Sequence, residues 1–268
     1  MKELTLQELK DIELDILKMF DSFCKENNIR YFLAFGTLLG AIRYKKFIPW
    51  DDDVDVLVPR EDYERLITLF QDSDKYHLYS FERNRKYAYP FAKLCDMTTR
   101  LDEIFYSKSK VQLGVNIDIF PLDHFDDDLQ EAKREILRIR KCNACLSYMK
   151  VDKPQTRNPI KFLVWTMIIT YCKMRGNQYY IRKVIRECNK PGQKGSRYVG
   201  AKAWPIWGDR IITPAEAFAQ AIEIEFEGEK FPAPIGYDAY LTCLYGDYLP
   251  EPPKEKQKTH HSFKAYKL

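Results

Sequence analysis

The chain has 268 residues, of which 45% are hydrophobic and 31% charged, and its formal net charge is +4. This composition excludes a disordered or fibrous protein, because the chain holds enough apolar residues to bury a core. The N-terminal segment lacks the apolar run of a secretion signal, and no later stretch reaches the roughly 18 apolar residues of a membrane span. We therefore expect a cytoplasmic protein.

Apolar periodicity and turn residues predict alternating helices and strands in the first half of the chain. Thr5 and Glu8 have the spacing of a capping box, which predicts a helix over about 5–27. Strands are expected at 30–35, 54–58, 76–81, 89–94 and 115–120, with helices following Gly36 and Pro59. This order predicts an α/β (α+β) fold in which helices flank a mixed β-sheet.

The second half of the chain begins with a helical pattern. It runs from Asp128 to about Cys188 and is interrupted near 153–159 and 175–177. Short elements follow at 198–201, 222–226 and 237–245, before a Pro-rich charged tail. We divide the chain into a catalytic core over 1–125, a basic helical insertion over 126–195 and a segment over 196–268 that completes the core.

Charge is distributed unevenly along the chain. Residues 1–130 hold 18 Lys/Arg and 25 Asp/Glu, whereas residues 131–202 hold 18 basic and only 4 acidic residues. Such a basic segment attracts nucleic acid, an anionic membrane or a phosphorylated substrate. No RNA-binding motif accompanies the charge, so we expect no nucleic-acid partner.

The most apolar part of the basic segment is 161–173, which contains Trp165 and Tyr171 and has basic flanks. It is too short to span a bilayer. Two interpretations stay open: the helix lies in a membrane interface at the inner face of the plasma membrane, or it is a buried helix beside a solvated basic neighbour.

A cluster of carboxylates provides the strongest chemical signal. Asp51, Asp52, Asp53 and Asp55 lie at the entrance of the strand expected at 54–58. Residues two apart on a strand face the same way, so Asp53 and Asp55 can converge on one ion. Oxygen ligands without adjacent His or Cys favour Mg²⁺ or Mn²⁺. Asp51 and Asp52 are interpreted as loop, capping or supporting residues.

Asp118 is the expected third acid, because it is a single carboxylate within the apolar strand pattern 115–120. If that strand lies beside 54–58, the three acids can hold ions for phosphoryl displacement. The alternative is that Asp118 caps a turn or pairs with a Lys or Arg. A calcium loop starting at Asp51 is disfavoured, since its sixth position is Val56 instead of Gly and its ninth is Pro59.

A turn with the residues Gly36-Thr37-Leu38-Leu39-Gly40 comes between the first strand and a helix, where backbone N–H groups can cradle a phosphate. Arg43, Lys45 and Lys46 follow it and can neutralise a diphosphate, or they form a solvated basic face. The order of turn, paired acids and third acid is that of the nucleotidyltransferase fold.

These motifs resemble those of the LicD family of phosphocholine transferases, which is related to the fukutin group. The resemblance is carried by 35–43, 47–56, 90–94, 116–123, 226–228, 245–248 and 252–261. It implies a nucleotidyltransferase-like fold and the transfer of phosphocholine from CDP-choline to a sugar hydroxyl, with release of CMP. The acceptor would be a lipid-linked precursor of a surface glycan such as teichoic acid or lipopolysaccharide.

The resemblance also implies roles for individual residues. Asp53, Asp55 and Asp118 would hold two Mg²⁺ ions, and Asp118 is the best candidate for deprotonating the acceptor. Lys93 is expected to contact phosphate, and Trp50 is the preferred aromatic for a choline cage. Four further substrate-binding residues come from the resemblance alone: Glu227, Asp247, His260 and His261.

Two alternatives belong to other classes of function. One is a nucleotidyltransferase that uses an NTP and releases pyrophosphate. The other is a non-enzymatic basic protein that binds RNA or membrane, which leaves the acidic strand unexplained. A comparison of labelled choline and nucleoside transfer separates the first from a phosphocholine transferase.

Overall fold

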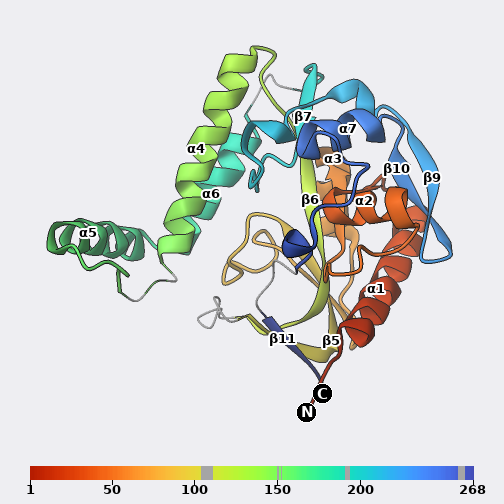
Figure 1. Ribbon diagram of the computed structural model, residues 1–268, viewed down its shortest axis with the longest axis horizontal. Helices are drawn as coiled ribbons and strands as arrows, with labels where there is room; N and C mark the ends of the chain where they lie inside the picture. Colours follow the sequence, from red (N-terminus) through yellow and green to blue (C-terminus); the bar gives the residue numbers. More distant parts are fainter. Residues whose placement is uncertain (104–110, 150, 152, 191–193, 259–262) are drawn as a thin grey trace.

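The structure of the protein is a computed structural model (Figure 1). It describes residues 1–103, 111–149, 151, 153–190, 194–258 and 263–268.

A mixed sheet forms the centre of the molecule. Its main path runs β1-β11-β5-β6-β3-β2, with β4 beside β5 and a β7–β8 extension beside β6. Strands β3 and β6 are parallel, whereas the other pairs are antiparallel. The strands of this sheet are β1 (Lys2–Glu3), β2 (Phe32–Leu33), β3 (Asp55–Pro59), β4 (Tyr76–Tyr79), β5 (Ala92–Glu103), β6 (Leu113–His124), β7 (Tyr198–Gly200), β8 (Thr213–Pro214) and β11 (Phe263–Lys267).

A separate hairpin, β9 (Ala221–Phe226) and β10 (Glu229–Pro234), packs beside β2 and α2. The α-helices are α1 (Leu6–Glu26), α2 (Phe35–Tyr44), α3 (Arg60–Leu69), α4 (Leu129–Tyr148), α5 (Pro159–Arg175), α6 (Asn177–Cys188) and α7 (Tyr237–Tyr245), with short 3₁₀ turns η1 (Gly208–Ile211), η2 (Ala215–Phe218) and η3 (Lys254–Lys256). Figure 1 shows α1, α2 and α3 on one side of β6 and α4, α5 and α6 on the other.

Helix α1 illustrates how local sequence sets an element. Thr5 accepts from the backbone N–H of Glu8 while the Glu8 carboxylate accepts from the Thr5 N–H, which is a complete capping box. Ile16, Leu17 and Phe20 lie on one face of the helix and are fully buried against the sheet.

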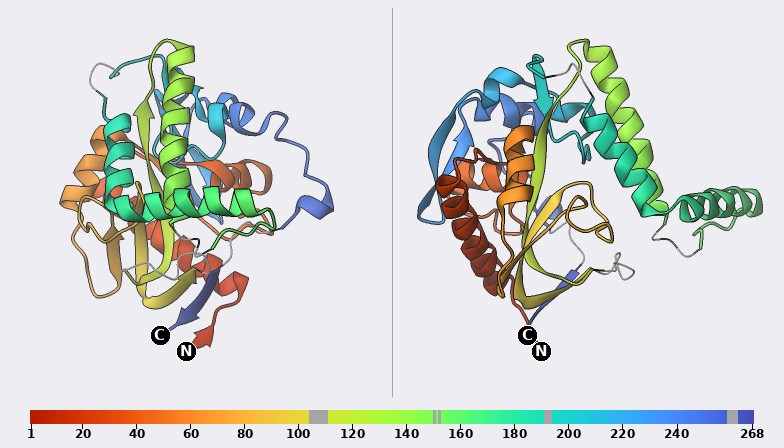
Figure 2. Two further views of the ribbon diagram at one scale, coloured as in Figure 1. Left: turned by 90° about the vertical axis from the view of Figure 1, so that its left-hand side faces the viewer. Right: turned by 180° about the vertical axis from the view of Figure 1, so that it is seen from behind.

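The helices α4 and α6 form a second, smaller core of their own. Ile139 and Cys142 of α4 pack against Ile181 and Val184 of α6 in a hydrophobic cluster distinct from the main one. A fully buried ion pair anchors this helical layer: the Nζ of Lys202 lies 2.8 Å from an oxygen of Glu135 on α4. Helix α5 extends from the foot of α4 and α6, away from the sheet (Figure 2).

The predicted fold class is confirmed, and the two predicted breaks fall between α4 and α5 and between α5 and α6. The strand expected at 89–94 instead begins at Ala92 and continues to Glu103. No strand was predicted in the Pro-rich charged tail, yet Phe263–Lys267 forms β11, because its backbone completes the antiparallel ladder on β5. The three-part division of the chain stays a prediction. No helix among the described residues has the length and hydrophobicity needed to cross a bilayer.

Candidate active site

Two carboxylates from parallel strands form the centre of the site. Asp55 on β3 and Asp118 on β6 are direct neighbours in the parallel register. The Asp118 N–H donates to the carbonyl of Val54 at 2.8 Å, which locks this register. Val54 and Val56 are fully buried, so the alternation of the strand turns their apolar side chains to the core and leaves Asp55 half-buried.

Lys93 on β5 completes a row of charges across three strands. It is the register neighbour of Asp118 on the antiparallel side, and its Nζ lies 2.5 Å from Asp118 Oδ1. The same Nζ donates to Asn116 Oδ1 at 3.0 Å. The order Asp55, Asp118, Lys93 therefore places one cation beside two anions.

The loop before β3 brings further carboxylates together. Asp51, Asp52 and Asp53 each place one oxygen within 4.8 Å of the others. Asp52 is buried, while Asp51 and Asp53 are half-buried. Asp51 and Asp52 were expected to be loop or supporting residues, and the structure places them with Asp53 in one cluster.

The crowding of carboxylates makes the ionised form of Asp55 unfavourable. Burial first, and then the charges of Asp53, Asp118 and Asp51, raise the pKa of Asp55 well above its ordinary value, and Lys93 opposes them. A divalent cation removes this penalty, because it attracts carboxylates that otherwise repel one another. The donor set consists of oxygens, so it fits Mg²⁺ or Mn²⁺.

The N-terminus of α2 is fastened to the acidic strand. The Asp55 N–H donates to Thr37 Oγ1 at 2.8 Å, and the Ala34 N–H donates to the Asp55 carbonyl at 3.0 Å. Phe35, a non-glycine residue, has a φ of 43°, so the entry turn is strained. A side chain at Gly36 would overlap the Asp51 carboxylate, which explains why glycine is needed at this approach.

Glu13 on α1 is a buried carboxylate that sequence reasoning missed. It is 3% exposed, and its Oε2 has no hydrogen-bond partner. One turn earlier, the Lys10 Nζ donates to the carbonyls of Ile48 and Pro49, which fixes α1 against the acidic loop. Burial, followed by the charge of Asp53, raises the pKa of Glu13 well above its ordinary value. Its position on the apolar stripe of α1 is a sequence signal that could have identified it.

An aromatic wall adjoins the row of charges. The Lys93 Nζ lies 5.1 Å from the Tyr89 ring centroid and 5.6 Å from that of Phe91. Phe91 contacts Trp204 edge to face at 5.5 Å, and Trp204 is half-buried. Burial and the charge of Asp55 raise the pKa of Tyr245, so this ring also lies near the acids.

Arg43 and Glu227 connect the site to the last third of the chain. Arg43 Nε donates to the Tyr248 carbonyl at 2.5 Å, and its Nη2 donates to the Pro250 carbonyl at 2.8 Å. The Phe47 N–H donates to Glu227 Oε1 at 2.9 Å. Arg43 thus holds the segment after α7 against α2, and Glu227 holds the loop that leads into the acidic strand. Their predicted contacts with substrate stay predictions.

The other predicted site residues are placed less centrally. Trp50 is half-buried and packs against the main core directly before Asp51. Lys45 pairs with Glu225 on the surface at 2.8 Å. Asp247 is exposed in the bend after α7. His260 and His261 lie outside the described residues.

Comparison with known proteins places this site in a family. Residues 28–144, which carry the turn and the acids, match the family described as LicD/FKTN/FKRP, nucleotidyltransferase domain. The whole chain is 33% identical to the lipopolysaccharide cholinephosphotransferase LicD of Haemophilus influenzae, and the alignment covers 100% of both proteins. The chain belongs to the LicD family.

Two further proteins match part of the chain. An uncharacterised protein of Rickettsia typhi is 27% identical over 50% of this chain and 42% of its own length. An uncharacterised protein of Rickettsia prowazekii is 43% identical over 18% of each chain.

Proposed function

We propose that this LicD family member is a phosphocholine transferase. The donor is CDP-choline, and the acceptor is a sugar hydroxyl of a lipid-linked precursor of lipopolysaccharide or teichoic acid. The observation that carries the proposal is the row Asp55, Asp118, Lys93 across β3, β6 and β5, in a chain that aligns over its full length with a cholinephosphotransferase.

The residues proposed to hold divalent metal are Asp53, Asp55 and Asp118. Asp51 and Asp52 cluster with Asp53, whereas Asp55 and Asp118 are neighbours through the strand register and lie outside that cluster. When bound, Mg²⁺ or Mn²⁺ would offset the negative charge of the donor diphosphate and of the leaving CMP. The raised pKa of Asp55 supports this assignment, since the carboxylates gain most from a counter-charge where they repel one another.

Asp118 is the proposed general base. The acceptor oxygen loses its proton to the Asp118 carboxylate and forms a bond to the phosphorus that bears choline. The bond from that phosphorus to the bridging oxygen breaks, and CMP leaves with that oxygen. Lys93, whose Nζ lies 2.5 Å from Asp118 Oδ1, orients that carboxylate and offers positive charge to the transferred phosphoryl group.

The aromatic residues around the charges are suited to choline. A quaternary ammonium ion cannot donate a hydrogen bond and is held by aromatic faces. Trp50 and Trp204 are half-buried, and Trp207 lies 4.9 Å from Tyr245 between ring centroids. We propose that the choline head group binds among these rings.

The proposed function is tested by incubating the purified protein with CDP-choline, CDP-ethanolamine or CDP-ribitol, each with Mg²⁺ or EDTA. CMP release and phosphocholine transfer to acceptor are expected with CDP-choline and Mg²⁺ only. Preference for another CDP-alcohol would reassign the head group. Pyrophosphate release from an NTP would overturn the proposal in favour of a nucleotidyltransferase.

The site of action follows from the substrates proposed. In this proposal the donor CDP-choline is in the cytoplasm, and the lipid-linked acceptor is at the inner face of the plasma membrane. We therefore propose a cytoplasmic enzyme that meets its acceptor at that surface, with no nucleic-acid partner.

A further inference from the structure

Helix α5 exposes an unusual amount of apolar surface. Its exposed fractions reach 62% for Leu163, 65% for Met167 and 83% for Met174. Only Ile169 and Cys172 of this helix are buried. The remaining large apolar residues exposed on it are Ile160, Phe162, Val164, Trp165, Ile168 and Tyr171. Contiguous apolar surface of this kind marks an interaction site.

The position of α5 leaves this surface accessible. Figures 1 and 2 show the helix projecting from the foot of α4 and α6, away from the central sheet. The helix has 17 residues and is therefore about 25 Å long, shorter than the roughly 30 Å of a hydrocarbon core. Its length suits a helix that lies in an interface and does not cross it.

The charge around α5 has a single sign. Residues 153–186 contain eight Lys/Arg and no Asp/Glu. Lys161, Lys173 and Arg175 of α5 are exposed, as are Arg182 and Lys183 of α6. A basic border around an apolar surface is complementary to a bilayer that contains anionic lipids.

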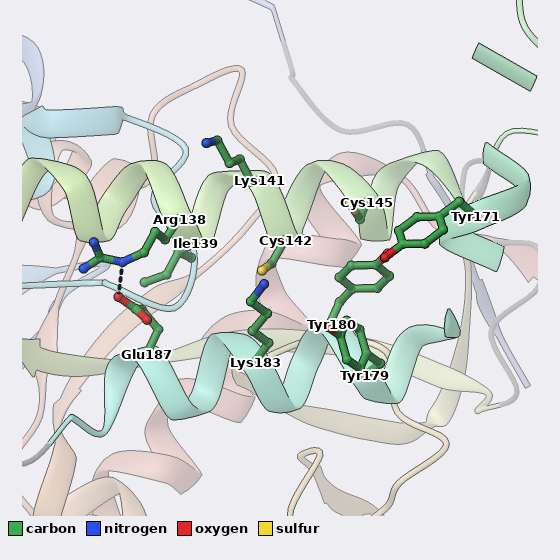
Figure 3. A pocket seen from close by; sticks show the side chains of 10 residues that line it. All are labelled: Arg138, Ile139, Lys141, Cys142, Cys145, Tyr171, Tyr179, Tyr180, Lys183 and Glu187. Atoms are coloured by element: carbon green, nitrogen blue, oxygen red, sulfur yellow. Dashed lines mark hydrogen bonds and ion pairs between the residues drawn. The ribbon is translucent and has the colours of Figure 1, made fainter. Parts of the chain in front are cut away.

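Aromatic and basic side chains also meet where α5 joins the body. A groove of about 290 Å³ lies between α4 and α6. Tyr171 of α5 and Tyr180 of α6 lie at one end of it, and Lys141 and Lys183 lie along it (Figure 3). The Arg175 guanidinium lies 5.4 Å from the Tyr171 ring centroid. Tyrosine and basic residues are enriched at the head-group level of membranes.

We propose that α5 docks the protein on anionic lipid bilayers, with its apolar side chains in the acyl boundary and its basic border among the head groups. The inference goes beyond the proposed chemistry, because it depends only on exposure, charge and the placement of α5. If the proposed function also holds, docking brings the site to a lipid-linked acceptor.

The test is co-sedimentation of the full chain with phosphatidylglycerol-containing vesicles and with phosphatidylcholine vesicles. Binding is expected to the anionic vesicles and to fall with salt. The double variant Leu163→Asp/Met167→Asp should weaken binding at least tenfold, because two apolar side chains no longer enter the acyl boundary. Leu69→Asp, at an exposed apolar residue of α3 (42% exposed), is the matched control and should bind as the wild type does.

Two results would overturn docking. In the first, the double variant binds vesicles as well as the wild type does. In the second, the wild type does not bind vesicles, and light scattering shows that it is a dimer whereas the double variant is a monomer. The second result would assign the surface to another copy of the chain. CMP release with a soluble acceptor should be unchanged in the double variant, which separates failure of docking from failure of the proposed chemistry.

Discussion

The carboxylates around Asp55 and the apolar surface of helix α5 differ in chemistry, but both are energetically unfavourable arrangements of side chains. Around Asp55, carboxylates crowd together until burial and mutual repulsion raise a pKa. On α5, side chains such as Leu163 and Met174 face water. Each region is unfavourable without a binding partner, and the partner that we propose for each has complementary chemistry: a cation for the carboxylates and a lipid surface for α5. The difference teaches that local instability can identify what a protein binds.

The largest expected effect is on the acidic side of this comparison. Asp118→Asn removes the proposed base and one of the charges in the row, and we expect kcat to fall by about 10²–10⁴-fold. The measurement is CMP release from CDP-choline with Mg²⁺. Asp74→Asn, at an exposed carboxylate, is the control. Undiminished turnover in Asp118→Asn would remove this carboxylate from the mechanism.

The next effect concerns how the α4–α6 layer is joined to the sheet. Lys202→Met leaves the buried Glu135 without its 2.8 Å partner, while Lys190 stays 3.7 Å from it, and we expect a loss of about 3 kcal/mol of unfolding free energy. Urea denaturation followed by circular dichroism measures it. Lys230→Met breaks the exposed pair with Glu223 and should cost less than about 1 kcal/mol. Equal losses in the two variants would contradict a buried anchor.

A smaller effect is expected from pH in the metal-free protein. The folded-state pKa values of Asp55 and Glu13 are raised, so the folded protein binds more protons than the unfolded chain above the ordinary carboxyl pKa of about 4. Stability in EDTA should therefore fall as pH rises from about 4 through the raised values. Thermal melts from pH 5 to 8 measure this fall, and added Mg²⁺ should reduce it. A stability that rises with pH in EDTA would show that these carboxylates are not crowded.

The smallest expected effect is a change in melting temperature when the buried carboxylate of Glu13 is replaced by an amide. Glu13→Gln keeps the shape of the side chain but cannot ionise, so it should melt like the wild type at pH 5 and higher than the wild type at pH 8 in EDTA. A gain of 1 kcal/mol corresponds to a shift of about 2–4 °C. Glu26→Gln, at the exposed end of α1, should leave the melt unchanged at both pH values. A lower melting temperature for Glu13→Gln at pH 8 would indicate that the charged carboxylate stabilises the fold.

Much of the fold and part of the site could be predicted, because they depend on local patterns. The Thr5–Glu8 capping box and the strand around Asp118 are set by nearby residues. The pairing of Lys93 with Asp118 could not be derived in the same way, since it depends on the register of two strands. Strand β11 was not predicted because Phe263–Lys267 is only five residues long and follows a Pro-rich charged segment.

The solvent exposure of helix α5 could not be predicted from the sequence either. The pattern around Trp165 is apolar on most sides of the helix, so periodicity alone could not distinguish a buried helix from a projecting one. Arg43 was expected near a diphosphate, but the carbonyls that it contacts come from residues more than 200 positions later. Contacts of that sequence separation leave no local trace.

The contact between Glu227 and the Phe47 N–H spans 180 positions of the chain, and it affects the order in which parts of the protein can fold. Synthesis proceeds from the N-terminus, and contacts between distant segments form late. A nascent chain that ends before the hairpin of β9 and β10 has the strands that carry Asp55 and Asp118, but it lacks the Glu227 contact that holds the loop leading into β3. We therefore expect the loop before Asp55 to reach its final position only after the last third of the polypeptide has been synthesised.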